Sequence, residues 1–145
     1  MNNRLQTASI LVLAVLFFIS CKKDNAPPAN NKENLSGTYK LTAYTATSPL
    51  TGSEVINLYN MMLPCQRDNM VTLKTDLTAT YTDAGVKCVP PEDASGTWNV
   101  TGKTFILDEE EATIEKFDGN TLILSANGTE NGIPFSYTST FTKQH

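Results

Sequence analysis

Apolar and polar residues alternate along most of the chain after residue 36, as expected of strands that bury one face. The alternation is clear in residues 39–43, 79–82, 98–101 and 135–138. Threonine, which suits a half-buried pleated surface, occurs 20 times, and 19 of these threonines follow residue 36. The pattern predicts eight strands, near residues 37–46, 69–75, 78–83, 96–101, 104–108, 112–117, 121–126 and 134–142.

Short turn sequences separate these predicted strands. Asp118-Gly119 and Asn127-Gly128 belong to the strongest hairpin signals, and further turns are predicted at residues 75–76 and 101–103. One short helix is predicted at residues 53–62, between the first two strands. Its apolar residues recur at helical spacing, Ser53 can cap its start, and a proline follows its end.

Successive strands joined by tight turns predict an all-β fold, an antiparallel meander. Its closure into an up-and-down barrel of eight strands, complete or partly open, would remove the exposed sheet edges. Eight strands enclose a space that side chains can fill or that can hold one small ligand. The alternation is compatible with either interior.

Residues 1–20 are predicted to be a secretory signal peptide rather than part of the fold. Arg4 precedes an apolar stretch, residues 8–19, in which Ser9 is the only polar residue. This stretch is shorter than the about 20 residues that a membrane span needs. Residues 18–21, Phe-Ile-Ser-Cys, resemble the lipobox of bacterial lipoproteins. The resemblance implies cleavage before Cys21 and its acylation, and two or more acyl chains anchor a protein stably. An ordinary signal peptide with a chance cysteine is the alternative.

Residues 21–35 are predicted to form the lipidated cysteine and a flexible tether, followed by one domain at residues 36–145. Residues 22–34 hold two prolines, four asparagines and no large apolar residue, so they bury too little surface to offset the entropy of ordering. In lipoproteins of this kind, Lys22 after the cysteine implies sorting to the outer membrane. The periplasmic face and the cell surface both stay open.

Charge and composition exclude several function classes. The formal net charge is −4, from 11 basic and 15 acidic residues, the wrong sign for binding nucleic acid. The only histidine is the last residue, His145, which argues against imidazole-based catalysis and histidine zinc sites. The acidic run at residues 108–111 lacks the spacing of a calcium loop and is interpreted as a solvated turn. We therefore expect no enzyme, no cofactor and no metal site.

Cys65 and Cys88 are expected to form a structural disulfide, because exported chains meet an oxidising compartment. A hairpin that turned at Asp76-Leu77 would place residue 65 opposite residue 88, within the reach of a disulfide. A redox role has little support, since the chain has no Cys-x-x-Cys motif and no nearby histidine.

Several short motifs, in this order, resemble the lipocalin-like domain of bacterial lipoproteins. They are residues 35–41, 65–69, 75–78 with Cys88, 96–98, 122–124 and 137–143. The resemblance covers most of residues 36–143. It implies a lipocalin-like barrel and a binding role, in a family whose ligands are largely unassigned. Tyr39 stands where the family often has tryptophan, and Asp76-Leu77 replaces the more usual Asp-Gly.

The residues predicted to point inward are compatible with a packed core and with a ligand pocket. They are Leu41, Leu73, Tyr81, Trp98, Val100, Phe105, Leu107, Ile114, Leu122, Leu124, Phe135, Tyr137 and Phe141. The candidate ligand-binding residues among them are Tyr81, Trp98, Phe105, Phe135 and Tyr137.

The leading hypothesis is a lipid-anchored, monomeric envelope lipoprotein that binds or carries a small apolar or amphipathic molecule. The alternative is a non-enzymatic interaction or scaffold domain that contacts a protein or glycan through residues 48–64 and 86–95. The alternative predicts an exposed apolar patch rather than a hollow.

Overall fold

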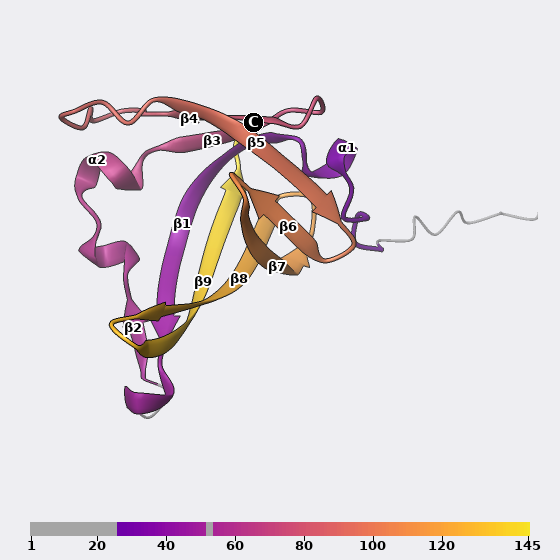
Figure 1. Ribbon diagram of the computed structural model, residues 1–145. Helices are drawn as coiled ribbons and strands as arrows, with labels where there is room; N and C mark the ends of the chain where they lie inside the picture. Colours follow the sequence, from indigo (N-terminus) through magenta and orange to yellow (C-terminus); the bar gives the residue numbers. More distant parts are fainter. Residues whose placement is uncertain (1–25, 52–53) are drawn as a thin grey trace, which may run out of the picture.

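The computed structural model describes residues 26–51 and 54–145, so the predicted signal peptide and Cys21 lie outside the described residues. The described chain forms one antiparallel sheet of nine strands with a few short helices (Figure 1). The strands are β1 (Gly37–Thr47), β2 (Val55–Asn57), β3 (Met70–Leu73), β4 (Thr78–Thr82), β5 (Ala94–Thr101), β6 (Thr104–Leu107), β7 (Glu110–Phe117), β8 (Thr121–Glu130) and β9 (Ile133–Lys143). The α-helices are α1 (Lys32–Leu35) and α2 (Pro64–Arg67), and 3₁₀ helices lie at Pro49–Thr51 and Tyr59–Met61. Across the part of the chain that is described, no helix has both the length and the apolar character to cross a membrane.

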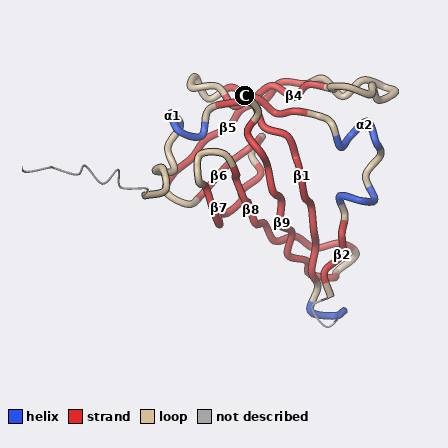
Figure 2. Tube along the Cα trace, turned by 180° about the vertical axis from the view of Figure 1, so that it is seen from behind, coloured by secondary structure: helices blue, strands red, loops and turns tan. Residues whose placement is uncertain are grey.

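Eight of the strands close into a barrel, as predicted. Each strand from β3 to β9 pairs antiparallel with the next, and β3 pairs with β1. The ring closes because β9 also pairs with β1, from Tyr39 opposite Lys143 to Thr47 opposite Ser136. Figure 2 shows β1, β8 and β9 as the long strands of this ring. β2 is the additional strand, paired only with the far end of β1 at Thr45–Thr47.

The helix predicted at residues 53–62 is wrong. Val55–Asn57 forms β2, and Tyr59–Met61 forms a single 3₁₀ turn. β1 runs beyond the residues that pair with β3, so its edge offers free backbone groups to this segment. Val55 and Ile56 are β-branched and suit a strand, while a ten-residue helix without tertiary support is marginal in water.

The hairpin between β3 and β4 has a three-residue loop, so the predicted two-residue turn is wrong by one position. Leu73 pairs with Ala79, and the Lys74 N–H donates to the Thr78 carbonyl at 2.9 Å. Leu77 closes the loop with a φ of 69°. A type I turn followed by one left-handed residue is a common form of three-residue hairpin loop.

The predicted disulfide between Cys65 and Cys88 is confirmed, with a Cα–Cα distance of 5.2 Å. Cys65 lies in α2 and Cys88 in the loop that joins β4 to β5. α2 precedes β3 and the loop follows β4, so both segments adjoin the open end of the β3–β4 hairpin, which explains why the pairing holds although the strand register differs. Asp83, fully buried, accepts hydrogen bonds from the Cys88 and Glu92 backbone N–H groups and so orders this loop.

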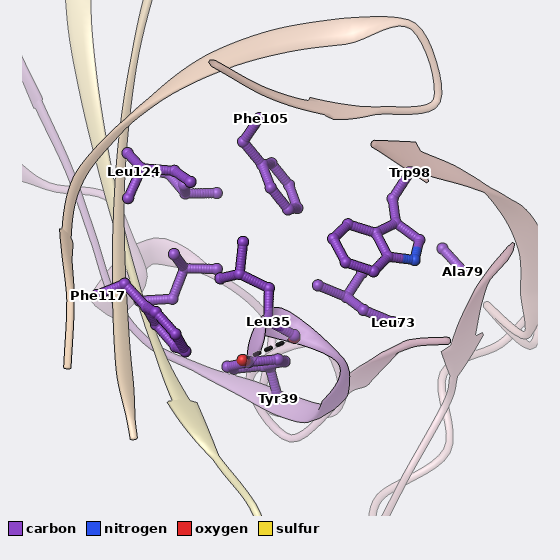
Figure 3. Packing of buried hydrophobic residues seen from close by; sticks show 10 residues of the cluster. Leu35, Tyr39, Leu73, Ala79, Trp98, Phe105, Phe117 and Leu124 are labelled. Carbon is purple, nitrogen blue, oxygen red and sulfur yellow. Dashed lines mark hydrogen bonds between the residues drawn. The ribbon is translucent and has the colours of Figure 1, made fainter. Parts of the chain in front are cut away.

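The hydrophobic core fills one end of the barrel, and α1 closes that end. Figure 3 shows how the side chains of this core pack. Leu35 at the end of α1 is fully buried, so the chain joins the fold before Ser36. The buried cluster comprises Leu35, Tyr39, Leu73, Ala79, Trp98, Phe105, Ile114, Phe117, Leu122 and Leu124. All but Leu35 come from barrel strands, on a face set by strand alternation. On β7 an irregularity between Ile114 and Lys116 brings Ile114 and Phe117 to the same face.

Polar contacts hold α1 against the closed end. The Tyr39 hydroxyl donates to the Leu35 carbonyl at 2.9 Å, the bond drawn in Figure 3. Lys143 donates to the Asn34 carbonyl at 3.1 Å, and its Nζ lies 5.6 Å from the centroid of the Tyr39 ring. Gly37 leaves room for this lysine, because a Cβ at residue 37 would lie 2.2 Å from Lys143 Cε. The Gly-Thr-Tyr motif at the start of β1 therefore helps to close this end of the barrel.

Candidate ligand-binding site

Two adjoining apolar hollows occupy the other half of the barrel. The larger has a volume of about 380 Å³ and lies among β4 and β6–β9. The smaller has a volume of about 240 Å³ and lies among β1, β3, β4, β6 and β9. Tyr81, Leu107 and Phe141 line both hollows. Ligand pockets commonly have volumes of 300–1,000 Å³ and mostly apolar walls, so the two hollows together have the size of a small-molecule site.

Strand alternation places the apolar walls of the hollows. Leu41 pairs with Phe141 between β1 and β9, and Leu107 pairs with Trp98 between β5 and β6. Directly opposed residues share a face of the sheet, as do residues two apart on one strand. Phe105 therefore shares the inner face with Leu107.

The closed half leaves almost no space. One cavity of about 20 Å³ lies there, lined by Tyr39, Val71, Leu73, Phe105, Leu107, Leu122, Leu124 and Phe141. A space of this size admits no more than a single water, and its walls are apolar. The barrel interior is thus packed at the α1 end and hollow at the opposite end, which we call the mouth. The alternation alone did not distinguish a packed interior from a hollow one.

The Asp108 carboxylate links β4 and β5 by hydrogen bonds at one side of the mouth. Asp108 accepts from the Tyr81 hydroxyl and, at 2.8 Å, from the Thr97 backbone N–H. Asp108 and Glu109 have φ values of 50° and 72° and form the two-residue turn between β6 and β7, a type I′ arrangement. Gly96 makes this contact feasible, because a Cβ at residue 96 would lie 1.8 Å from Asp108 Oδ1.

The two partners shift one another's protonation. Burial, together with the Asp108 hydrogen bond, raises the pKa of the Tyr81 phenol. The Tyr81 hydroxyl, followed by the Thr97 N–H, lowers the pKa of the Asp108 carboxyl. Tyr81 therefore stays a donor and Asp108 a charged acceptor throughout the neutral range.

A second carboxylate lies on the smaller hollow. Glu92 accepts from Asn69 Nδ2 at 2.8 Å and from Gln66 Nε2 at 3.2 Å. The Asn69 bond fixes the orientation of that amide, since a flip would bring two oxygens together. Asn69 Oδ1 is buried and, among the described residues, has no hydrogen-bond partner.

The five predicted ligand-binding residues occupy different places. Tyr81, Phe105 and Tyr137 line the larger hollow. Trp98 is 2% exposed and packs against Phe105 in the filled half, and its indole N–H donates to a backbone carbonyl at the β3–β4 hairpin. Phe135 packs against Tyr137 but lines a separate surface hollow near the β8–β9 turn. The structure thus brings three of the five together on the larger hollow.

Other wall residues were missed by the sequence reasoning. Val71, two residues before the predicted inward Leu73, could have been found from the same alternation. Asp108 was assigned to a solvated turn, and its bond to Tyr81 joins strands distant in sequence. Glu92 and Asn69 carry no local signal, because loop packing near the disulfide brings them to the hollow. Within residues 26–51 and 54–145, no three His, Cys, Asp or Glu side chains group closely enough to hold a metal ion.

Comparison with known proteins identifies the family. A family model described as a lipocalin-like domain matches residues 35–130, well over half of the chain. Searches of curated proteins and of solved structures found no significant match. The matched segment begins at the buried Leu35 and includes both cysteines of the disulfide. The chain therefore belongs to the lipocalin-like domain family.

Proposed function

We propose that this protein is a lipid-anchored envelope lipoprotein whose barrel binds or carries a small apolar or amphipathic molecule. The observation that carries the proposal is the division of the interior into a packed end and an apolar hollow at the mouth. A barrel needed only as a rigid scaffold would gain stability from filling this space. Lipocalin-like domains are, in general, a binding and carrier fold.

The anchoring part of the proposal rests on the lipobox-like sequence before Cys21 and on Lys22 after it. The described chain enters the barrel through α1, at the packed end. An acyl anchor that precedes this point leaves the mouth free for exchange of a ligand. Attachment to the outer membrane, on its periplasmic or outer face, and a monomeric state complete the proposal.

The proposed role is non-enzymatic and needs no cofactor. The hollow is lined mainly by hydrocarbon and aromatic side chains, and its charged groups are carboxylates. Asp108 is already engaged by two donors. The single histidine, His145, follows the end of β9, so the residues favour retention of a molecule over its conversion.

Native mass spectrometry of the full chain, purified from envelope membranes, tests the proposal. We expect a co-purifying small molecule on the wild-type chain. Ser139→Phe, which adds a ring on the wall of the larger hollow, should lose it. Thr138→Phe, on the opposite face of the same strand, should keep it. A chain free of any adduct, or equal retention by Ser139→Phe, would refute a binding role for the hollow.

One observation favours the second candidate function, an interaction domain. Within the described residues, the exposed large apolar residues all fall in the two segments, 48–64 and 86–95, that the alternative predicts. They are Leu50, Val55, Met61, Leu63, Val86 and Val89, of which Val89 is 97% exposed. Where such residues lie close enough to form a contiguous patch, they mark a contact surface. Loss of a cross-linked envelope partner in Met61→Ser/Val89→Ser, with no loss in Ser139→Phe, would support this second function.

A further inference from the structure

The chain enters the barrel through a docked segment at the closed end. Residues 26–35 precede β1, and the two prolines at residues 27–28 line a surface hollow together with Phe117 of β7. The Asn34 side-chain amide donates to the Ala29 carbonyl at 3.0 Å. Figures 1 and 2 place α1 at the end of the molecule opposite to β2. These contacts set the place at which the chain leaves the barrel.

The connection between this place and the proposed anchor is short. Four residues, 22–25, separate Cys21 from the first described residue, Ala26. Even fully extended, a connection of this length spans at most about 18 Å. β9 runs from the far end of the molecule to the closed end over 11 residues, about 35 Å. The closed end is therefore held near the acylated cysteine, and the mouth meets the membrane only if the barrel lies on its side.

The distribution of charge disfavours a barrel that lies on its side. The segments at the closed end hold five lysines and four acidic residues, within residues 26–37, 74–77, 102–103, 114–120 and 142–145. The segments at the mouth end hold two basic and ten acidic residues, within residues 48–51, 54–69, 83–93, 108–111 and 130–132. A membrane with anionic lipids attracts basic groups near its surface, so it repels the mouth end and favours contact with the closed end.

Lys103 lies beside the place where the chain leaves the barrel. It is exposed and lines the same hollow as residues 27–30. The two acidic residues of this hollow are engaged, because Glu115 accepts from a serine hydroxyl and Asp118 pairs with Lys116 at 2.9 Å. In the described part of the chain Lys103 forms no ion pair, which leaves its ammonium group available to a lipid phosphate.

We propose that the closed end of the barrel is the membrane-facing surface of this protein and lies on the head groups of the membrane that holds its acyl chains. This inference rests on the lipid anchor of the proposed function and adds the orientation of the barrel. Lys103 contacts lipid phosphates beside the emerging chain, and the mouth opens away from the membrane. The ligand of the hollow then exchanges with the aqueous phase rather than directly with the lipids of the anchoring membrane.

NMR of the ¹⁵N-labelled full chain, purified in acylated form and reconstituted in nanodiscs with gadolinium-bearing head groups, tests this orientation. Gly102 and Gly119 report on turns at the closed end, and residues 85 and 132, also glycines, report on loops at the mouth end. Because paramagnetic broadening falls steeply with distance, we expect the amide signals of the first pair to be lost and those of the second pair to persist. Nanodiscs without gadolinium give the reference intensities, and mass spectrometry of the same sample verifies the acylation of Cys21.

A length variant tests the short connection. Ten glycine and serine residues inserted between Asn25 and Ala26 add a root-mean-square reach of about 18 Å. In phosphatidylcholine nanodiscs, where lipid charge contributes little, this insertion should reduce the difference in broadening between the two pairs of glycines. The same ten residues appended after His145 should leave the difference unchanged.

Charge variants test the contact with lipid phosphates. Phosphatidylglycerol in the nanodisc should increase the difference in broadening, and added salt should remove this gain. Lys103→Gln should lose part of the gain. Lys40→Gln, which removes a lysine from the middle of β1, should keep it.

The outcomes separate this inference from the proposed anchor. Equal broadening of the four glycines, or an unchanged difference in the insertion variant, overturns the orientation, while an acylated Cys21 still supports the anchor. The same holds if Lys40→Gln reduces the phosphatidylglycerol gain as much as Lys103→Gln does. A chain without acyl groups on Cys21 overturns both.

Discussion

Loss of the Cys65–Cys88 disulfide should destabilise the barrel by about 3 kcal/mol. The two cysteines are 23 residues apart in sequence, and the loop-closure relation for a cross-link of this span gives about 3 kcal/mol at 25 °C. For a domain of this size, that free energy corresponds to a fall of roughly 10 °C in the melting temperature. The link joins α2 to the loop of Glu92, so its loss should also loosen one side of the mouth.

Urea unfolding followed by tryptophan fluorescence measures this change. Trp98 is the only tryptophan and is 2% exposed, so its emission reports loss of the packed core. Cys65→Ser/Cys88→Ser should unfold at lower urea than the oxidised chain, and the reduced wild-type chain should match the variant. Reductant should not affect the variant itself. A loss below about 1 kcal/mol would refute the loop-closure reasoning.

Three further predictions concern the closed end, the mouth and the β7–β8 turn. Leu35→Ala should lower the free energy of unfolding by about 2–5 kcal/mol, measured in urea, whereas Leu50→Ala, 70% exposed, should change it little. Tyr81→Phe should raise the pKa of Asp108, because it removes the hydrogen bond that lowers that pKa most; carboxyl NMR titration measures this shift. Hydrogen bonds from the Thr121 backbone and Lys116 lower the pKa of Asp118 from 3.8 to about 2. Its contribution to stability is therefore complete above about pH 4 and lost as the pH falls towards 2, and Asp118→Asn should flatten this part of the profile of urea midpoint against pH.

The sequence predicted the barrel strands well because their signals are local. Alternation identifies a strand and its inner face from the strand's own residues. Asp118-Gly119 marks its hairpin because glycine at residue 119 adopts a φ of 94°, which other residues rarely adopt. The turn predicted at Asn127-Gly128 is wrong, because both residues lie within β8 and the β8–β9 turn falls at Asn131-Gly132. Eight strands predicted in this way correspond to β1 and β3–β9.

The misplaced elements depend on partners that a local pattern does not contain. The spacing of Val55, Ile56 and Tyr59 fits a helix, but the free edge of β1 provides a pairing partner that only the closed barrel creates. The loop after β3 has three residues rather than the predicted two because Leu77 adopts a left-handed conformation. Leucine rarely adopts that conformation, so sequence favours the wrong alternative there.

The boundary between packed and hollow interior follows from side-chain size along the inward positions. On β7, Phe117 and Ile114 lie in the core, while Ala112 lines the larger hollow. On β8, Leu122 and Leu124 precede Ala126, and on β9, Phe141 lies between the core and Ser139. On β7 and β8 the inward residues thus pass from large to small towards the mouth, and on β9 the small Ser139 lies between Phe141 and Tyr137. The hollow therefore borders small inward residues from three strands. Alternation tells which residues point inward, but only the strand register tells which of them lie at the same height, and this is why the site became visible only in the fold.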